Sequence, residues 1–282
     1  VLCALWGIQQ VAIKVANAGI SPVLQAGLRS AGAAMLIWIW AAIRGVRLVD
    51  RSTPIGLAFL IGVMFGSEFL LIYWGLTFTT ASRSVVLLYT APFFVAIGAH
   101  LFIPGERLRP LQWLGLAAAF GGIVVTFGDA LRLPTRHELI GDVMVFAAAA
   151  VWAATTVIIK ATRLRMLEPS KTLFYQLAVS GVVLPVAAVV LGESGITALT
   201  PLVAASLFYQ TVVVAFASYL AWFWLVKHYP ASRLSAFSFL TPLFGVSAGV
   251  LLLSEPVTMA LIFALVLVAT GIYLVNRQPA GE

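Results

Sequence analysis

Two stretches of this chain decide its fold: residues 74–106 read WGLTFTTASRSVVLLYTAPFFVAIGAHLFIPGE, and residues 224–255 read WLVKHYPASRLSAFSFLTPLFGVSAGVLLLSE. The tripeptide Ala-Ser-Arg is common to both, at 81–83 and 231–233, and Pro92 matches Pro242. After one deletion Glu106 matches Glu255. Because a repeated sequence indicates a repeated structural unit, we predict two halves of like order.

A weaker repeat lies upstream of each stretch. Trp6 and Lys14 are eight residues apart, and so are Trp152 and Lys160. The predicted halves therefore cover nearly the whole chain, as a first five-helix repeat over residues 1–128, a connecting loop over 129–139 and a second five-helix repeat over 140–282.

The composition is that of a membrane protein. The chain has 282 residues, 62% hydrophobic and only 10% charged, whereas soluble domains carry about 25% charged residues. The net charge of +7 does not indicate nucleic acid as a partner, because the basic residues are scattered in short groups between apolar runs. Cys3 is the only cysteine, which excludes an intrachain disulfide and a cysteine metal cluster.

Breakers such as Pro54, Pro169 and Pro201 separate ten apolar segments, each close to the roughly 20 residues that span a bilayer. The segments run approximately over residues 1–16, 21–43, 54–77, 82–103, 110–128, 140–162, 170–191, 201–226, 231–253 and 257–276. The first segment is short for a full span and carries no visible signal peptide, so we expect further residues to precede Val1.

The basic residues predict the orientation. If the segments alternate in direction, most loop arginines and lysines fall on one side, which is then cytoplasmic. Both termini are expected on that side, and the lipid bilayer, as the inner (plasma) membrane of a bacterium, is the expected surroundings. Since each half has an odd number of spans, the second half enters the membrane from the opposite face, and an inverted repeat of this kind places a binding site near the midplane between the halves.

These features resemble one known family. Ten spans, paired five-helix halves, the Trp-Gly pair at Trp6 and the duplicated Ala-Ser-Arg…Pro…Glu segment are similar to the EamA branch of the drug/metabolite transporter superfamily, and most similar to its bacterial exporters of aromatic amino acids. The resemblance implies ten helices around a central cavity, with segments 1, 3, 4, 6, 8 and 9 near it. It also implies export of a small metabolite as the substrate and partner, with no cofactor and no required oligomer.

Two charged residues fall deep inside predicted spans. Arg29 lies about eight residues inside segment 2 and Glu68 about nine inside segment 3, at a similar depth from one face. Charges at that depth are costly and mark functional sites. Two interpretations remain: a structural ion pair between the helices, or a Glu68 that couples transport to protons or meets a substrate ammonium group.

Aromatic and hydroxyl side chains supply the candidate substrate-binding residues. Tyr89 and Phe93 share one helical face of segment 4, and segment 9 offers a matching face. An apolar surface with a few hydroxyl groups suits an amphipathic organic ligand; ordinary helix packing is the alternative for each residue. The candidates are Trp6, Gln10, Tyr89, Phe93, Trp152, Ser235, Ser238 and Phe239. We expect Trp74, Trp222 and Trp224 to anchor segment ends at the membrane interface.

Pro92 and Pro242 fall in the middle of equivalent segments, where a missing N–H group can kink a helix. They are the predicted hinges of a transporter that works by alternating access. An enzyme would need a nucleophile and base, or metal ligands, at membrane depth, and the chain has neither an HExxH nor a GxSxG motif. We therefore predict no catalytic residues and no metal site. A channel remains an alternative, although the sequence shows no ring of charges.

Overall fold

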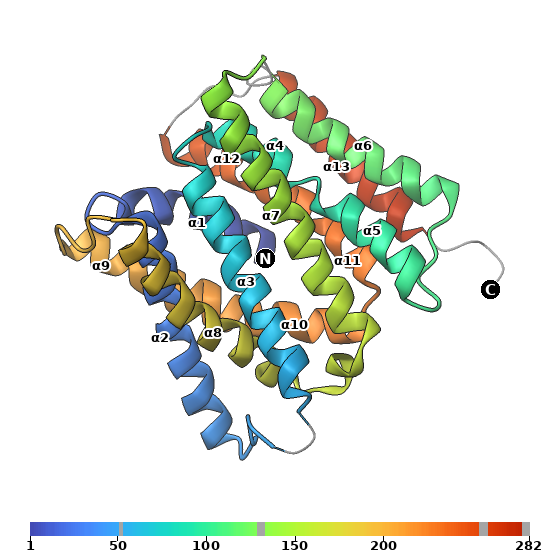
Figure 1. Cartoon of the computed structure of the whole chain (residues 1–282). Coiled ribbons are helices and arrows are strands. Elements are labelled where there is room, and N and C mark those ends of the chain that lie inside the picture. Colours follow the sequence, from blue (N-terminus) through green and yellow to red (C-terminus); the bar gives the residue numbers. More distant parts are fainter. Residues whose placement is uncertain (51–52, 129–132, 254–258, 278–282) are drawn as a thin grey trace.

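The protein is all-helical (Figure 1) in a computed structural model that describes residues 1–50, 53–128, 133–253 and 259–277, without the side chains of Gln10, 248–253 and 260. Within these residues, seven helical stretches of 18 residues or more are apolar enough to cross a membrane. Shorter apolar helices occupy Leu2–Ala16 and Leu261–Asn276. The predicted class, an all-α membrane protein, is confirmed.

The first half is built from six helices, most of which begin near a proline. A proline in the first helical turn costs little, because that N–H group has no partner within the helix. The helices are α1 (Leu2–Ala16), α2 (Pro22–Ile43), α3 (Ile55–Gly75), α4 (Ala81–Leu88), α5 (Ala91–Phe102) and α6 (Pro110–Phe127). These bounds match the predicted segments within a few residues.

The second half repeats this order. Its α7 begins at Arg136, earlier than predicted, because Thr135 and Glu138 form a capping box there. The elements are α7 (Arg136–Ala161), the short 3-10 turn η2 (Arg163–Met166), α8 (Pro169–Val190), α9 (Pro201–Phe208), the π-helix η3 (Tyr209–Ser218), α10 (Tyr219–His228), α11 (Ala231–Ala236), the 3-10 turn η4 (Phe237–Phe239), α12 (Leu240–Leu253) and α13 (Met259–Asn276).

Both halves are interrupted just before their repeated proline. The helix of segment 4 stops at Leu88 and restarts at Ala91, so that Pro92 lies in the first turn of α5 instead of mid-helix. In segment 9, the turn η4 separates α11 from α12, and Pro242 lies in the first turn of α12. Each proline therefore follows a short interruption of the α-helix, a turn at residues 89–90 in segment 4 and the 3-10 turn η4 in segment 9. A hinge at these positions stays a prediction.

Helix packing follows a two-fold exchange of the halves. The second helices of each half, α2 and α8, pack on each other, and so do the fifth, α6 and α13 (Figure 1). The packing of α3 on α7 in one direction corresponds to the packing of α9 and η3 on α1 in the other. In the same way, the packing of α4 and α5 on α7 corresponds to the packing of α12 on α1. Every one of these contacts is reproduced when first-half and second-half elements are exchanged.

Loop contacts at one end of the molecule join the connections between segments 2–3, 4–5, 6–7 and 8–9. Lys171 pairs with Asp50. Lys160 Nζ lies 3.3 Å from Glu106 Oε1 and donates to the carbonyl oxygen of Tyr229 at 2.6 Å. All four connections thus lie at the same end.

Contacts at the opposite end join loop 1–2 to loop 7–8, and loop 3–4 to the start of α7. Thr197 N donates to the Gly19 carbonyl oxygen at 2.9 Å, which joins loop 1–2 to loop 7–8. Asp142, near the start of α7, pairs with Arg83 and accepts from Thr79 Oγ1 at 2.6 Å. Loop 2–3 and its repeat counterpart, loop 7–8, therefore lie at opposite ends, which is the geometry of an inverted repeat.

Candidate functional site

A cavity of about 160 Å³ lies between the two halves. Its wall takes side chains from α1, α3 and α4 of the first half and from α7, α8, α10 and α12 of the second. These elements include all six segments that the resemblance placed near a central cavity. In secondary transporters built from inverted repeats, the substrate site lies at the same place, between the halves.

Aromatic rings form one wall. Trp6 packs edge to face against Trp222, with ring centroids 5.2 Å apart, and against Tyr219 at 6.2 Å. Phe65 extends this wall from α3 and contacts the Tyr219 ring at 6.2 Å. The Trp6 indole is held in place because its Nε1 donates to Ser218 Oγ at 2.9 Å. The wall is therefore preorganised to receive a flat apolar group.

Polar groups without partners face the same space. Both side-chain polar atoms of Gln176 and the hydroxyl of Tyr73 are buried, line the cavity and have no hydrogen-bond partner within the described part of the chain. Buried polar groups are almost always paired, so exceptions call for water or a ligand. This part of the wall is suited to the polar head of a solute.

Glu68 adds a carboxylate to this polar wall, and Arg29 lies behind it. Glu68 is 7% exposed and lines the cavity, whereas Arg29 is fully buried and does not. The Arg29 guanidinium sits over the Phe69 ring, with Cζ 4.3 Å from the centroid. Its three nitrogens make no hydrogen bond to any described residue. The two charges are neighbours through α2 and α3, but they do not form a contact ion pair in this conformation.

Several candidates from the sequence meet in this cavity. Trp6, Tyr89, Trp152 and Glu68 all line it. The side chain of Gln10 lies outside the described residues; its neighbour Gln9 is buried and lines the cavity.

Four other candidates lie outside the cavity wall. Phe93 packs on Phe120 with ring centroids 5.4 Å apart, and Phe239 is fully buried in the same apolar cluster. Ser235 Oγ donates to the Ser232 carbonyl oxygen at 3.1 Å, and Ser238 Oγ to that of Ser235 at 2.6 Å. Their hydroxyl groups are thus satisfied within the α11–η4 segment, and the two rings fill the contact between α5, α6 and η4.

The described residues contain no group of three or more histidine, cysteine, aspartate or glutamate side chains that could hold a metal ion. A family model described as the EamA-like transporter family matches residues 1–128 and 139–277. The chain belongs to the EamA-like transporter family.

Relatives agree with this assignment along the full chain. The EamA-like chain is 28% identical to a probable amino-acid metabolite efflux pump of Escherichia coli (strain K12), over 96% of this chain and 90% of the relative. It is 29% identical to the uncharacterized transporter YvbV of Bacillus subtilis (strain 168), over 100% and 91%. A solved crystal structure superimposes with a TM-score of 0.84 at 17% identity, covering 98% of this chain and 93% of that one. The protein is a multi-pass membrane transporter of the drug/metabolite transporter superfamily and not an enzyme.

Some cavity residues of this EamA-like transporter were missed by sequence reasoning. Trp222 was expected at the membrane interface because it lies near a segment end; the structure places it in the cavity wall instead, beside Trp6. Tyr219 and Trp222 are three residues apart on α10, so they share a face. That spacing could have indicated that Trp222 faces the cavity, because segment 8 shows no other apolar stripe. Phe65 could have been found in the same way, three residues before Glu68.

Proposed function

We propose that this transporter exports small metabolites, most favourably aromatic or other neutral amino acids, across the inner (plasma) membrane of a bacterium by alternating access. The observation that carries the proposal is the cavity between the halves, which is lined by aromatic rings together with buried polar groups and one carboxylate. An aromatic side chain fits the rings, and an amino-acid head group fits the polar groups.

Within this proposal the candidates that line the cavity, and the two prolines, have the following roles. Trp6, Trp152 and Tyr89 contact the solute, and Glu68 receives its ammonium group. The helix interruptions just before Pro92 and Pro242 absorb the movement of segments 4 and 9. The two halves, residues 1–128 and 140–282 with a connecting loop over 129–139, rock against each other. Both termini lie in the cytoplasm, on the arginine-rich side that also carries loops 2–3, 4–5, 6–7 and 8–9.

The test is transport by the purified protein in liposomes. A panel of labelled solutes would contain phenylalanine, tryptophan, methionine, threonine and a sugar, each measured with and without a pH gradient. We expect saturable uptake and counterflow of the aromatic amino acids. Equal transport of the sugar would remove the amino-acid assignment, and uptake without saturation or counterflow would indicate a channel.

A different drug or metabolite of the same superfamily is the second candidate. The relative in Escherichia coli is named for amino-acid metabolites, which favours amino acids, but a wall rich in aromatic rings also accepts other flat solutes. Competition by unlabelled compounds against the best amino acid in the same liposomes separates the two candidates.

A further inference from the structure

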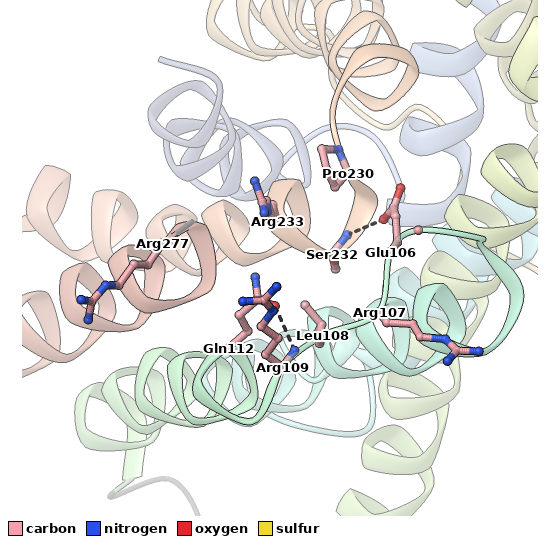
Figure 2. A pocket seen from close by; sticks show the side chains of 10 residues that line it. Glu106, Arg107, Leu108, Arg109, Gln112, Pro230, Ser232, Arg233 and Arg277 are labelled. Atoms are coloured by element: carbon pink, nitrogen blue, oxygen red, sulfur yellow. Dashed lines mark hydrogen bonds between the residues drawn. The ribbon is translucent and has the colours of Figure 1, made fainter. Parts of the chain in front are cut away.

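A second and larger cavity, of about 330 Å³, opens at the arginine-rich end of the molecule (Figure 2). It lies where the start of α6 and the preceding loop, from the first half, meet the start of α11 and the end of α13, from the second half. None of the transport candidates lines it. It is therefore a separate site from the cavity between the halves.

Arginines from three different elements surround this cavity, which we call the basic pocket. Arg109 precedes α6, Arg233 lies in α11 and Arg277 follows α13. Figure 2 shows Arg109 and Arg233 on facing sides, whereas the side chains of Arg107 and Arg277 point away from them. A bias for basic residues in cytoplasmic loops explains their presence. It does not explain why distant parts of the chain bring them to one hollow.

Glu106, the carboxylate that lines the basic pocket, does not neutralise Arg233 or Arg277. Glu106 Oε2 accepts from Ala231 N at 2.7 Å, and its Oε1 lies 3.3 Å from Lys160 Nζ. Arg233 and Arg277 pair with no carboxylate of the described chain. Two guanidinium groups thus line the cavity without a counter-charge.

The frame of the basic pocket is rigid. Gln112 Oε1 accepts from Arg109 N at 3.0 Å, and Gln112 Nε2 donates to the Val275 carbonyl oxygen at 2.8 Å. This side chain fastens the start of α6 to the last turn of α13. The positions from which Arg109 and Arg277 project are therefore fixed before any ligand arrives, and planar guanidinium groups held in this way bind phosphate oxygens in pairs.

Apolar side chains continue from the basic pocket toward the membrane. Leu111 and Leu114, three residues apart on α6, are 42% and 60% exposed, and Tyr273 on α13 is 64% exposed. Tyr273 precedes Arg277 by one helical turn, and tyrosine favours the depth of lipid head groups. A charged head in the hollow would thus have lipid-facing apolar surface directly beside it.

We propose that the basic pocket binds a phosphate-bearing anion, with the phosphate between Arg109 of the first half and Arg233 of the second. The ligand is either the head group of an anionic phospholipid of the same leaflet or a free phosphate compound; basic pockets between transmembrane helices are typical sites for anionic head groups. Because the arginines come from both halves, the bound anion joins the halves at this end. The proposal holds whatever solute is transported.

The test compares ligand-induced stabilisation of the purified full chain in detergent. Phosphatidylglycerol, phosphatidylcholine and inorganic phosphate are added separately to the protein, to Arg109→Gln/Arg233→Gln and to a control, Arg47→Gln/Arg163→Gln. The control removes two exposed arginines of the same end, outside the pocket. Native mass spectrometry counts the retained lipids, and thermal melts measure affinity, because a ligand of the native state raises the melting temperature.

We expect the parent and the control to bind phosphatidylglycerol in preference to phosphatidylcholine, and the pocket variant to lose about tenfold or more in affinity, since each arginine near an anionic head group contributes on the order of a fivefold factor. Stabilisation by inorganic phosphate as well would identify a free anion as the ligand; stabilisation by the lipid alone would identify the head group. Equal losses in both variants, or no preference among the three ligands, would overturn the proposal.

Discussion

Glu68 is the cavity residue whose substitution should have the largest effect, because its carboxylate lines the solute space while the Arg29 charge lies buried behind it. We expect Glu68→Gln to lower transport of an amino acid at least tenfold. It should also lower stability, by on the order of 3 kcal/mol, because the buried charge of Arg29 loses its nearest counter-charge. Liposome uptake and thermal melts measure the two effects.

The double variant Glu68→Gln/Arg29→Gln separates the two roles. If Glu68 serves only to balance Arg29, the double variant should recover both stability and transport. If Glu68 receives the solute, stability should return while transport stays low. Full transport by Glu68→Gln alone would rule out any role of this carboxylate in the transport cycle.

Trp222 tests the aromatic wall. Its ring packs on Trp6 at the cavity, so Trp222→Leu should raise the KM for an aromatic amino acid several-fold by removing a stacking surface. Trp38 on α2 is 59% exposed on the outer surface, and Trp38→Leu is the matched control with little expected effect. Initial uptake rates over a range of solute concentrations provide both values. Equal KM values in the two variants would contradict the assignment of the wall.

Some of the residues that line the cavity could be predicted from the sequence, for physical reasons. Depth within an apolar segment is visible in a sequence, and it led to Glu68 and to Trp152. The direction of a side chain around the helix axis is not visible where a segment is apolar on all sides, which is why Phe93 and Phe239 were placed with the cavity candidates. Whether a hydroxyl bonds to its own helix, as in Ser235 and Ser238, depends on rotamers that a sequence does not show.

Among the elements, the junction of loops 1–2 and 7–8 depends on a backbone approach that only glycine permits. A Cβ on Gly19 would lie 1.8 Å from the Ala198 carbonyl oxygen, an impossible contact, and this approach lies next to the isolated bridge between Ile20 and Ile196. We expect Gly19→Ala to force these loops apart and to lower the melting temperature by several degrees, because relief requires a backbone shift.

Gly56→Ala is the control for that change. A Cβ on Gly56, in the first turn of α3, meets nothing within 4 Å, so alanine should be neutral or stabilising by up to about 1 kcal/mol through its helix propensity. Melts of the two variants in the same detergent test the difference. A Gly19→Ala variant as stable as the parent would show that the two loops do not hold each other in the membrane protein.

The helix bounds were largely predictable, because proline starts or ends a helix through its effect on the neighbouring backbone alone. Kinks were predicted at Pro92 and Pro242, and the structure shows a short interruption of the α-helix just before each of them, a turn at residues 89–90 and the 3-10 turn η4. The π-helix at Tyr209–Ser218 was not predicted. Its wide turn depends on packing against α1 and α2, and no particular amino-acid composition marks it in the sequence. Local chemistry thus predicts where helices end better than how they are wound.

For the whole molecule, the inverted arrangement was predictable from counting alone: five spans in each half place the second copy upside down. The contacts that close one end were not, because they join residues far apart in the chain: Glu106 and Ala231 are 125 positions apart, and Lys160 and Tyr229 are 69 apart. Glu106 caps the start of α11 and pairs with Lys160, and Lys160 in turn holds Tyr229 of loop 8–9. This network closes the arginine-rich end between the two halves.

Lys160→Met removes the centre of that network and should shift the transporter toward the conformation open at the arginine-rich end. The measurement uses Ile159→Cys, a buried cavity position, in a Cys3→Ser background, with a membrane-impermeant maleimide added from that end. We expect labelling to rise about tenfold or more, since losing an interaction of on the order of 1.4 kcal/mol changes a two-state population by that factor. Lys227→Met removes an exposed charge of the same end as a control; equal labelling in both variants would mean that Lys160 does not hold the two halves together.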